Sequence, residues 1–284
     1  MKSDILNRFD LQGRVAAITA GGGDLCGAMA EALGAMGVKV AVLDIDLKKA
    51  EARSFAVTRS GGAAKAFQCD VLDREQVREC SEAVCKLWGP PDFLINGAGG
   101  NALRATTSGE FYSPTGSSDP ATQSFFALDP TGFRQVFDLN FMGTFLVSQV
   151  FSQGMVERGK GSIVNISSMS AFTPLTKVPA YSAAKAAVSN FTQWLAVYFS
   201  RTGIRVNALA PGFFMTEQNK FLLLNQKTGG LLPRGEKAIA HTPMGRFGLP
   251  EDLIGTLVWL LSDASSFVTG VLVPVDGGFS SYSI

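Results

Sequence analysis

The strongest chemical feature of the sequence is a tyrosine and a lysine that stand one helical turn apart. Tyr181 and Lys185 belong to the stretch Tyr-Ser-Ala-Ala-Lys, and Ser168 ends the apolar run that precedes them. A phenol with a pKa of about 10 transfers protons poorly at neutral pH unless a nearby cation stabilises the phenolate. We expect Lys185 to supply that charge, Tyr181 to act as general acid and base, and Ser168 to hydrogen-bond the reacting oxygen.

A glycine-rich turn is the second feature with chemical content. The predicted strand Arg14–Thr19 runs into Ala-Gly-Gly-Gly-Asp-Leu-Cys-Gly and then directly into a helix. Such a turn lets backbone N–H groups at a helix N-terminus bind a pyrophosphate. The next strand is followed by Asp44, whose carboxylate would accept hydrogen bonds from ribose hydroxyls and repel a 2′-phosphate. The pattern therefore predicts a dinucleotide cofactor and favours NAD over NADP.

Composition excludes several classes of protein. The chain has 284 residues and a formal net charge of +1, with 46 % hydrophobic and 17 % charged residues. This balance predicts a folded protein and argues against a nucleic-acid partner, because nucleic-acid-binding proteins carry a basic excess. No apolar run reaches the ~18 residues of a membrane span, and Met1–Arg14 lacks the apolar core of a secretion signal. We therefore expect a cytoplasmic protein that binds neither nucleic acid nor membrane.

The number and spacing of the histidine and cysteine residues leave hydroxyls, amines, carboxylates or a bound cofactor to carry the chemistry. His241 is the one histidine, which excludes a multi-histidine site, and we predict no metal. The residues around His241 favour a role for it in fixing a loop. The four cysteines, Cys26, Cys69, Cys80 and Cys85, contain no Cys-x-x-Cys pair, and we interpret them as reduced core thiols.

The elements that must position these residues alternate between strands and helices along the whole chain. The runs typical of strands are Arg14–Thr19, Val38–Leu43, Ala64–Cys69, Phe93–Asn96, Ser162–Ser167, Ile204–Ala210 and Gly270–Val275. Helical periods include Cys26–Met36, Arg74–Leu87, Thr131–Val156 and Ala180–Thr202. Strands covered on both faces are nearly unbroken apolar runs, as several of these are. We predict a single α/β domain over residues 1–284 with a doubly wound, seven-stranded parallel sheet of the Rossmann type.

Two long segments interrupt the alternation. Gly100–Pro130 is rich in Gly, Ser, Thr and Pro, and Phe213–Gly248 contains a Gly-Gly pair near its middle. Both follow strands, so both should lie at the carboxyl edge of the sheet, where open α/β folds bind ligands. Loops of this length in a compact domain are usually functional, and we expect these two to form active-site loops.

Several motifs together resemble the short-chain dehydrogenase/reductase family over essentially the whole chain. They are NGAG at Asn96–Gly99, Asn140 in NFMG, ISS at Ile166–Ser168, YSAAK at Tyr181–Lys185, PG at Pro211–Gly212 and VDGG at Val275–Gly278. The resemblance implies a nicotinamide-dependent oxidoreductase with the catalytic residues Asn140, Ser168, Tyr181 and Lys185. It also implies that Asn140 supports a water linking Lys185 to solvent, and that Thr216 contacts the nicotinamide carboxamide.

The same resemblance to the family implies which residues bind the cofactor and how the chains assemble. We assign the cofactor-binding set to Gly21, Gly22, Gly23, Leu25, Asp44, Asp70, Val71, Asn96, Ala98, Gly99, Tyr181, Lys185, Pro211, Gly212, Phe213 and Thr216. Members of the family commonly form tetramers through their long helices and last strand. The resemblance thus implies a homotetramer.

The glycine-rich turn departs from the family pattern. That pattern is usually TGxxxGxG, and a gapless match places Ala20, Asp24 and Cys26 at its three glycine positions. The neighbouring glycines are expected to restore the backbone freedom that the turn requires. A carboxylate beside a pyrophosphate weakens binding unless it points elsewhere, so Asp24 leaves the strength of cofactor binding open.

The two long loops resemble those of a narrower group within the family, the bacterial D-mannonate oxidoreductases. The matching stretches begin at Gly99, Ala105, Thr216 and Pro233. The resemblance implies interconversion of D-mannonate and D-fructuronate, a substrate that needs polar contacts and a cation for its carboxylate. The candidate substrate residues are Asn101, Arg104, Gln218, Asn219, Lys220 and Arg234, and Lys177 is a further cation nearby.

Three alternative functions remain open at this stage. Two lie within the family: a keto-sugar-acid or polyol enzyme similar to gluconate 5-dehydrogenase, and a 3-oxoacyl-carrier-protein reductase. The polar loop residues argue against the acyl substrate. The third is a non-catalytic nucleotide-binding protein, which the altered glycine turn suggests and the complete set of Asn140, Ser168, Tyr181 and Lys185 opposes.

Overall fold

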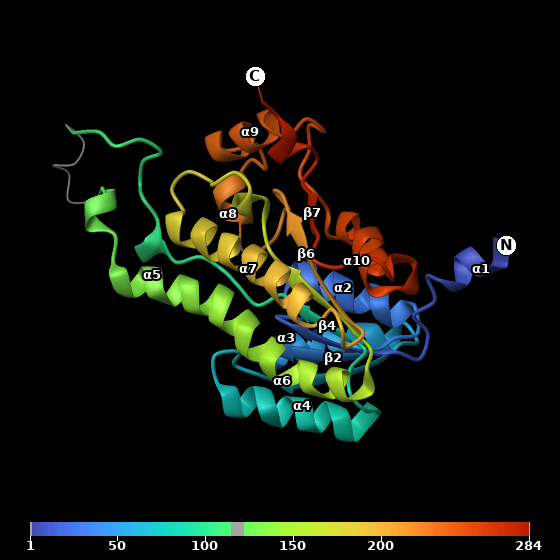
Figure 1. Ribbon diagram of the computed structural model, residues 1–284. Coiled ribbons are helices and arrows are strands. Elements are labelled where there is room, and N and C mark those ends of the chain that lie inside the picture. Colours follow the sequence, from blue (N-terminus) through green and yellow to red (C-terminus); the bar gives the residue numbers. More distant parts are fainter. Residues whose placement is uncertain (1, 115–121, 218, 284) are drawn as a thin grey trace.

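A seven-stranded parallel sheet forms the centre of the computed structural model, which describes residues 2–114, 122–217 and 219–283 (Figure 1). The strand order is β3-β2-β1-β4-β5-β6-β7, and every neighbouring pair is parallel. The strands are β1 (Val15–Thr19), β2 (Lys39–Asp44), β3 (Ala63–Gln68), β4 (Phe93–Asn96), β5 (Gly161–Ile166), β6 (Ile204–Pro211) and β7 (Leu272–Val275). The predicted fold class, a doubly wound parallel sheet of the Rossmann type, is confirmed.

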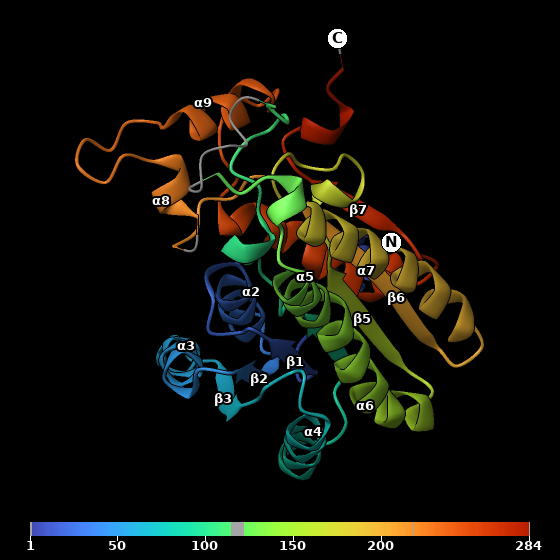
Figure 2. The same cartoon turned by 90° about the vertical axis from the view of Figure 1, so that its left-hand side faces the viewer.

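Helices cover both faces of the sheet, as Figure 2 shows for α2 and α4 on opposite sides. The main helices are α2 (Asp24–Ala35), α3 (Leu47–Arg59), α4 (Arg74–Trp88), α5 (Pro130–Phe137), α6 (Gly143–Arg158), α7 (Pro179–Tyr198), α9 (Pro233–Ala240) and α10 (Ile254–Leu261). Because neighbouring side chains of a strand point to opposite faces, Ile18 packs with α2, α3 and α10, whereas Ala17 packs with α4, α6 and α7. All five residues of β1 are buried, which explains its unbroken apolar sequence.

The predicted helix over Thr131–Val156 is wrong in one respect, because it is not continuous. A π-helical segment, Asp138–Met142, separates α5 from α6. Its central residue, Asn140, donates from Nδ2 to the carbonyl oxygens of Val136 and Gly100, both at 2.7 Å. π-bulges frequently mark functional sites, and here the break turns a polar side chain toward a distant loop. The other predicted boundaries differ from the structure by a few residues at most.

The second long segment contains more regular structure than the sequence indicated. It includes the short helix α8 (Lys220–Leu223) and the longer α9. Figure 1 shows α8 and α9 above the sheet on the same side as the chain's C-terminal end. The described residues of the first segment include the 3₁₀ turns Leu103–Ala105 and Phe125–Ala127. The described residues of both segments follow the carboxyl ends of β4 and β6, as predicted.

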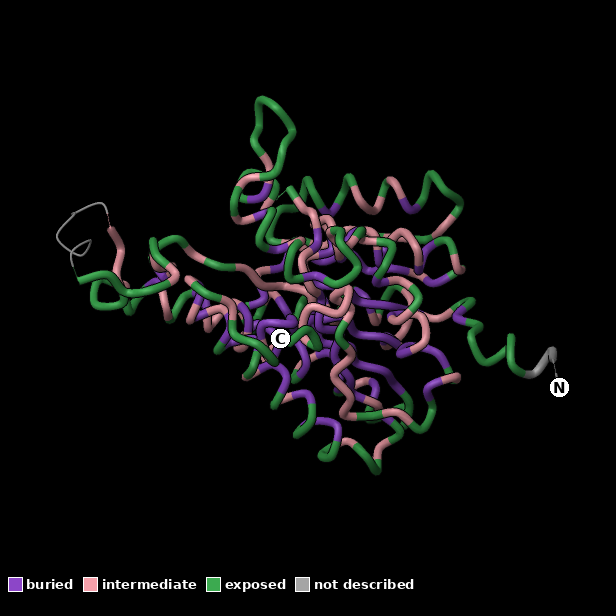
Figure 3. Tube along the Cα trace, turned by 90° about the horizontal axis from the view of Figure 1, so that it is seen from above, coloured by how far each residue is buried: buried purple, intermediate pink, exposed green. Residues whose placement is uncertain are grey.

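The N-terminal helix α1 (Lys2–Asn7) projects away from the remaining structure, and residues 5–10 are exposed (Figure 3). None of the described helices is long and apolar enough to cross a membrane. Nor do three or more His, Cys, Asp or Glu side chains among the described residues group in a way that could hold a metal ion.

Candidate active site

Tyr181 and Ser168 meet where β5 gives way to α7. Ser168 follows the last residue of β5 by two positions, is 6 % exposed, and accepts a hydrogen bond from the backbone N–H of Ser170 at 3.1 Å. Tyr181 lies in the first turn of α7, which begins at Pro179. Burial of the phenol raises the pKa of Tyr181, and a side-chain hydrogen bond with Ser168 acts in the opposite direction. The tyrosine is therefore held protonated at neutral pH.

Lys185 is a buried cation one helical turn beyond the tyrosine. Its side chain is 4 % exposed, and Nζ lies 5.7 Å from the centre of the Tyr181 ring. The ammonium group donates to the carbonyl oxygen of Ile166 at 2.7 Å. Burial lowers the pKa of Lys185 to about 8, so removing solvent from this cation outweighs its favourable contacts.

Asn140 borders the same space as Lys185. A Cβ atom placed on Gly99 would lie 2.5 Å from Oδ1 of Asn140 and 3.1 Å from Nζ of Lys185. The absence of a side chain at Gly99 thus keeps a small polar space open between the amide and the ammonium group. Together with the contacts above, this brings the four predicted catalytic residues, Asn140, Ser168, Tyr181 and Lys185, to one place at the carboxyl edge of the sheet.

The glycine-rich turn presents backbone donors at the start of α2. The N-cap residue, Gly23, makes no side-chain hydrogen bond to the first turn. The first N–H groups of a helix lack intrahelical partners, so this N-terminus carries donors and a positive dipole suited to an anion. Ala20 adopts φ +51°, the left-handed region that favours glycine, at the first glycine position of the family pattern. The donor set fits a pyrophosphate.

Asp44 lies directly beside this turn. Its Oδ2 accepts from the backbone N–H of Gly22 at 3.0 Å, and its Oδ1 accepts from that of Asp46 at 3.0 Å. Each carboxylate oxygen has two lone pairs, so both retain capacity for ribose hydroxyls. The two backbone bonds fix the carboxylate in position next to the donors of α2.

Cys26, at the third glycine position of the family pattern, is accommodated by a glycine elsewhere. A Cβ atom on Gly97 would lie 2.1 Å from Sγ of Cys26 and 2.9 Å from the carbonyl oxygen of Thr19. The thiol fills the space that a side chain at position 97 would need. Burial raises the pKa of Cys26 to about 12, so it is an inert core thiol.

This packing predicts a coupled effect on stability. Gly97→Ala should lower the free energy of unfolding by about 1–3 kcal/mol, because the added methyl group overpacks a filled interior. In the double variant Cys26→Gly/Gly97→Ala the loss should be smaller than the sum of the single losses by at least about 0.5 kcal/mol. Urea unfolding of the four proteins in the cycle measures this, and strict additivity would contradict the proposed contact.

Other predicted cofactor residues make contacts within the protein. Asn96 is 2 % exposed, and its side chain donates to Ser148 Oγ at 2.9 Å, so its amide is used in the interior. Val71 is also buried, with 7 % exposed, and its Cγ2 packs against Gly143, where an added Cβ would lie 2.8 Å away. Asp70 accepts from the backbone N–H of Leu72 at 2.9 Å and so fixes its own loop.

Most of the predicted substrate residues are engaged in local structure. Asn101 donates to Thr106 Oγ1 at 2.8 Å, and Arg104 pairs with Asp129 at 3.5 Å along α5. Asn219 uses both ends of its amide on the backbone of its own turn, and Lys220 pairs with Glu217 at 3.4 Å. Gln218 lies outside the described residues. Among the six, Arg234 lines a cavity of the described structure.

That cavity, of about 480 Å³, is lined in part by the loop that connects Ser168 to α7, and the four predicted catalytic residues are not in its lining. Its lining consists of Glu110, Thr173, Pro174, Leu175, Thr176, Lys177, Phe213, Pro233, Arg234, Lys237, Ala238, His241 and Phe279. The stretch from Thr173 to Lys177 connects Ser168 to α7, and the Leu175 N–H donates to the hydroxyl of Ser182, next to Tyr181, at 3.3 Å.

Sequence reasoning missed the contribution of α9 and of the C-terminal segment to this cavity. Lys237 pairs with Glu110, and Phe279 stacks edge-on against Phe213 with 5.4 Å between ring centres. His241, expected to fix a loop, donates from Nδ1 to the Lys237 carbonyl oxygen at 3.1 Å and also lines the cavity. Pro233, at the first position of α9, was the available signal for this helix.

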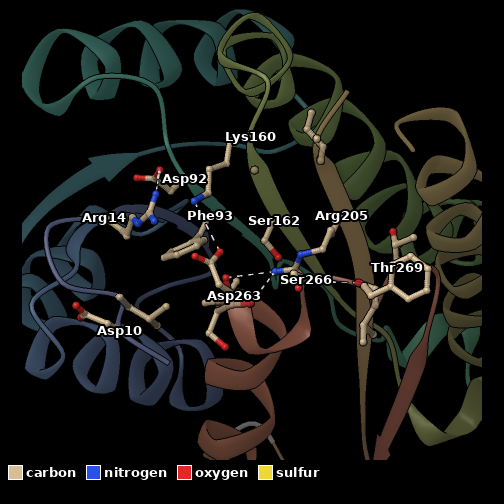
Figure 4. A pocket seen from close by; sticks show the side chains of 18 of the residues that line it. Asp10, Arg14, Asp92, Phe93, Lys160, Ser162, Arg205, Asp263, Ser266 and Thr269 are labelled. Atoms are coloured by element: carbon tan, nitrogen blue, oxygen red, sulfur yellow. Dashed lines mark hydrogen bonds and ion pairs between the residues drawn. The ribbon is translucent and has the colours of Figure 1, made fainter. Parts of the chain in front are cut away.

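A second cavity, of about 470 Å³, lies at the opposite, amino-terminal edge of the sheet (Figure 4). Its charged side chains engage one another: Arg14 pairs with Asp92 at 3.3 Å, and Lys160 with Asp263 at 3.7 Å. Arg205 donates to a serine hydroxyl and to backbone carbonyl groups. We interpret this cavity as structural, because its charges satisfy one another and it is far from the catalytic edge.

Comparisons with known proteins agree with the geometry. A family profile described as Enoyl-(Acyl carrier protein) reductase matches residues 24–280. The chain is 52 % identical to the uncharacterized oxidoreductase UxuB of Bacillus subtilis, across 96 % of this chain and 97 % of that protein.

Solved structures show the same similarity. A crystal structure of a provisionally assigned D-mannonate oxidoreductase from Haemophilus influenzae, with bound NAD, has 47 % identity and a TM-score of 0.91, and 96 % of this chain and 97 % of that protein are covered. A provisionally assigned 2-deoxy-D-gluconate 3-dehydrogenase from Agrobacterium tumefaciens, with bound NADP, has 29 % identity and a TM-score of 0.80, covering 97 % and 100 % of the two proteins.

Proposed function

The chain belongs to the short-chain dehydrogenase/reductase family and is an oxidoreductase of the alcohol dehydrogenase type; from this premise we propose that it interconverts D-mannonate and D-fructuronate. The proposal includes NAD as the cofactor and Tyr181 as the proton donor and acceptor. The observation that carries it is the charge of the cavity lined in part by the loop that connects Ser168 to α7.

Three cations surround one carboxylate in that cavity. The pKa of Glu110 is held below its usual range by a hydrogen bond from Lys237 and by the charges of Lys177 and Arg234. Three positive charges against one negative charge leave this wall with an excess of positive charge. Such a wall suits a substrate that carries its own carboxylate, and the planar fork of Arg234 can bind one through two hydrogen bonds.

Lys177 occupies a backbone conformation that supports this interpretation. It has φ +71°, which is uncommon for a residue with a side chain, and its carbonyl oxygen accepts from the Thr107 N–H at 2.9 Å. Strained residues of this kind cost about 1–3 kcal/mol and cluster at ligand sites. The bond from the first long loop therefore holds Lys177 at the cavity wall.

The proposed mechanism uses the buried tyrosine as an acid in the direction of ketone reduction. When bound, the nicotinamide supplies the hydride for the ketone carbon. Tyr181 donates its phenolic proton to the developing alkoxide; burial raises its pKa, so the phenol is protonated at neutral pH, and the phenolate that forms depends on the charge of Lys185. Ser168 hydrogen-bonds the same oxygen, and Lys185, with Asn140 beside it, supports the phenolate that remains.

The proposed preference for NAD rests on Asp44. Its carboxylate is fixed beside the start of α2 by the Gly22 and Asp46 backbone bonds. A 2′-phosphate at the adenosine ribose would meet this negative charge, whereas ribose hydroxyls can donate to it.

The test is ketone reduction followed by loss of NADH absorbance. D-Fructuronate is compared with D-fructose, which has no carboxylate, with 5-keto-D-gluconate and with an acetoacetyl thioester, and each is repeated with NADPH. We expect kcat/KM for D-fructuronate to exceed that for D-fructose by at least about 10²-fold, the effect of one or two charge-assisted hydrogen bonds. NADPH should be the poorer reductant.

Two variants connect this result to the cavity. Arg234→Gln should reduce the preference for D-fructuronate over D-fructose, whereas the matched control Arg104→Gln, whose side chain pairs with Asp129, should leave it unchanged. Efficient turnover of another ketone would keep the chemistry and reject the substrate. If NADH binds but no ketone is reduced, a non-catalytic binding protein becomes the better interpretation.

We further propose a homotetramer, supported by an aromatic surface on α7. Phe191, Trp194 and Tyr198 stack in sequence, and Trp194 is 56 % and Tyr198 66 % exposed. Exposed aromatic clusters of this kind are typical of interfaces. Sedimentation equilibrium measures the assembly directly, and a monomer would contradict the proposal.

A further inference from the structure

Asp24 places a carboxylate at the start of the helix that is suited to bind a pyrophosphate. It is the first residue of α2 and follows the N-cap Gly23. The N–H groups and dipole of a helix N-terminus attract anions, and a free carboxylate there would compete with a phosphate for the same donors. The position of Asp24 therefore requires another partner for its side chain.

The structure shows that partner. Oδ2 of Asp24 accepts a hydrogen bond from the backbone N–H of Glu217 at 2.7 Å. Glu217 lies in the segment that follows β6 and is the neighbour of Thr216, which the family resemblance assigns to the nicotinamide carboxamide. The contact thus joins the turn proposed to hold the pyrophosphate to the segment proposed to hold the nicotinamide.

The segment around Glu217 is a preformed turn. Oδ1 of Asn219 accepts from the Thr216 N–H at 2.9 Å, and Nδ2 of Asn219 donates to the Phe214 carbonyl at 2.7 Å. The Lys220 N–H also donates to the Thr216 carbonyl at 2.9 Å. Because these bonds make the turn move as a unit, one bond at Glu217 restrains all of it.

We propose that Asp24 is a positioning residue that holds the segment 213–217 closed over the bound cofactor. We call the Asp24–Glu217 hydrogen bond the latch. The inference rests on the dinucleotide cofactor of the proposed function and not on the substrate. Cofactor that lies between the turn and the segment leaves when the segment opens, so the latch slows its dissociation. It also directs the carboxylate away from the phosphate donors.

The experiment compares two variants that separate the latch from charge. Asp24→Ala removes the acceptor, whereas Asp24→Asn removes the charge and keeps an acceptor oxygen. In stopped-flow fluorescence we expect NADH to dissociate roughly five-fold faster from Asp24→Ala, and within about two-fold of the wild-type rate from Asp24→Asn. Glu217→Ala, which keeps the backbone donor, is the matched control and should leave the rate unchanged.

Hydrogen exchange supplies a readout that needs neither cofactor nor turnover. In the free protein the Glu217 amide should exchange faster in Asp24→Ala than in the wild type, by a similar factor, and Asp24→Asn should preserve its protection. Unchanged exchange and unchanged NADH dissociation in Asp24→Ala would overturn the latch.

Tighter NADH binding in both variants would also overturn it, because the carboxylate would then act only by repelling the phosphates. Failure of the proposed substrate is a separate outcome: the wild type would bind NADH and reduce no keto-sugar acid, while the latch measurements would still stand. Absence of NADH and NADPH binding to the wild type would overturn both proposals.

Discussion

Replacement of Tyr181 by phenylalanine should lower kcat for ketone reduction by about 10²- to 10⁴-fold, the usual contribution of a general acid or base. The variant loses one hydroxyl group and retains the ring that packs beside Lys185. The dissociation constant for NADH should change little, because the phenolic proton is used in the reaction and not in holding the cofactor. Single-turnover kinetics and NADH fluorescence titration measure the two quantities separately.

The matched control is Tyr198→Phe on the same helix. Tyr198 is 66 % exposed and stacks on Trp194, so removing its hydroxyl should leave turnover at the wild-type level. Near-normal activity of Tyr181→Phe would reject the tyrosine as the proton donor. Loss of NADH binding together with activity would indicate that the hydroxyl supports the cofactor site, and would equally contradict the proposed role.

The sequence was sufficient to predict the fold, and to predict that Tyr181, Lys185 and Ser168 lie together, for a local reason. The strands are short apolar runs, and each run predicts its element from its own residues. Tyr181 and Lys185 share a helix face by spacing alone, and Ser168 follows the strand that feeds this helix. Parallel strands end at a common edge, so topology brings such residues together without knowledge of any particular contact.

What the sequence could not predict depends on contacts between distant residues. The break at Asn140 arises because its amide bonds to Gly100, and helical periodicity carries no sign of that partner. Cys26 stands where the family pattern has a glycine. Its side chain fits there only because Gly97, which it contacts, has no side chain.

The substrate end of the site is the least predictable part for the same reason. Residues in long loops were judged by chemical type, and several prove to bond their own backbone, as Asn219 does. Lys237 was overlooked although it pairs with Glu110 from the other long loop. Which polar side chain stays free for a ligand is decided by the tertiary packing of the loops, and residue type alone does not encode it.

Replacement of Lys185 is the second change from which we expect a large effect. The same buried charge influences both turnover and stability. Lys185→Met should abolish most turnover, because Tyr181 loses the cation that supports its phenolate. The variant also removes a buried ammonium whose folded pKa is about 8, below the ordinary lysine value of 10.5. Since a lowered lysine pKa means that folding disfavours the charged form, this group destabilises the wild type wherever the ammonium is charged.

The sign of the pH dependence follows from the two pKa values. Below pH 8 both the folded and the unfolded wild type carry the charge, and its destabilising effect is complete. Between pH 8 and 10.5 the unfolded state binds more protons than the folded state, so the wild type gains stability with rising pH relative to Lys185→Met. The slope in this window should approach but not exceed about 1.4 kcal/mol per pH unit.

Urea unfolding of both proteins across this pH range measures the difference. The Ile166 carbonyl loses its donor in the variant, but that cost is independent of pH and shifts the whole curve without changing its slope. Lys86→Met, at an exposed position on α4, is the matched control and should show a difference from the wild type that does not vary in the same window. A flat difference for Lys185→Met would mean that Lys185 titrates as it does in the unfolded state. Such a result would contradict the lowered pKa of Lys185 and the burial cost inferred from it, whereas retained turnover in Lys185→Met would reject the ammonium as the charge that supports Tyr181.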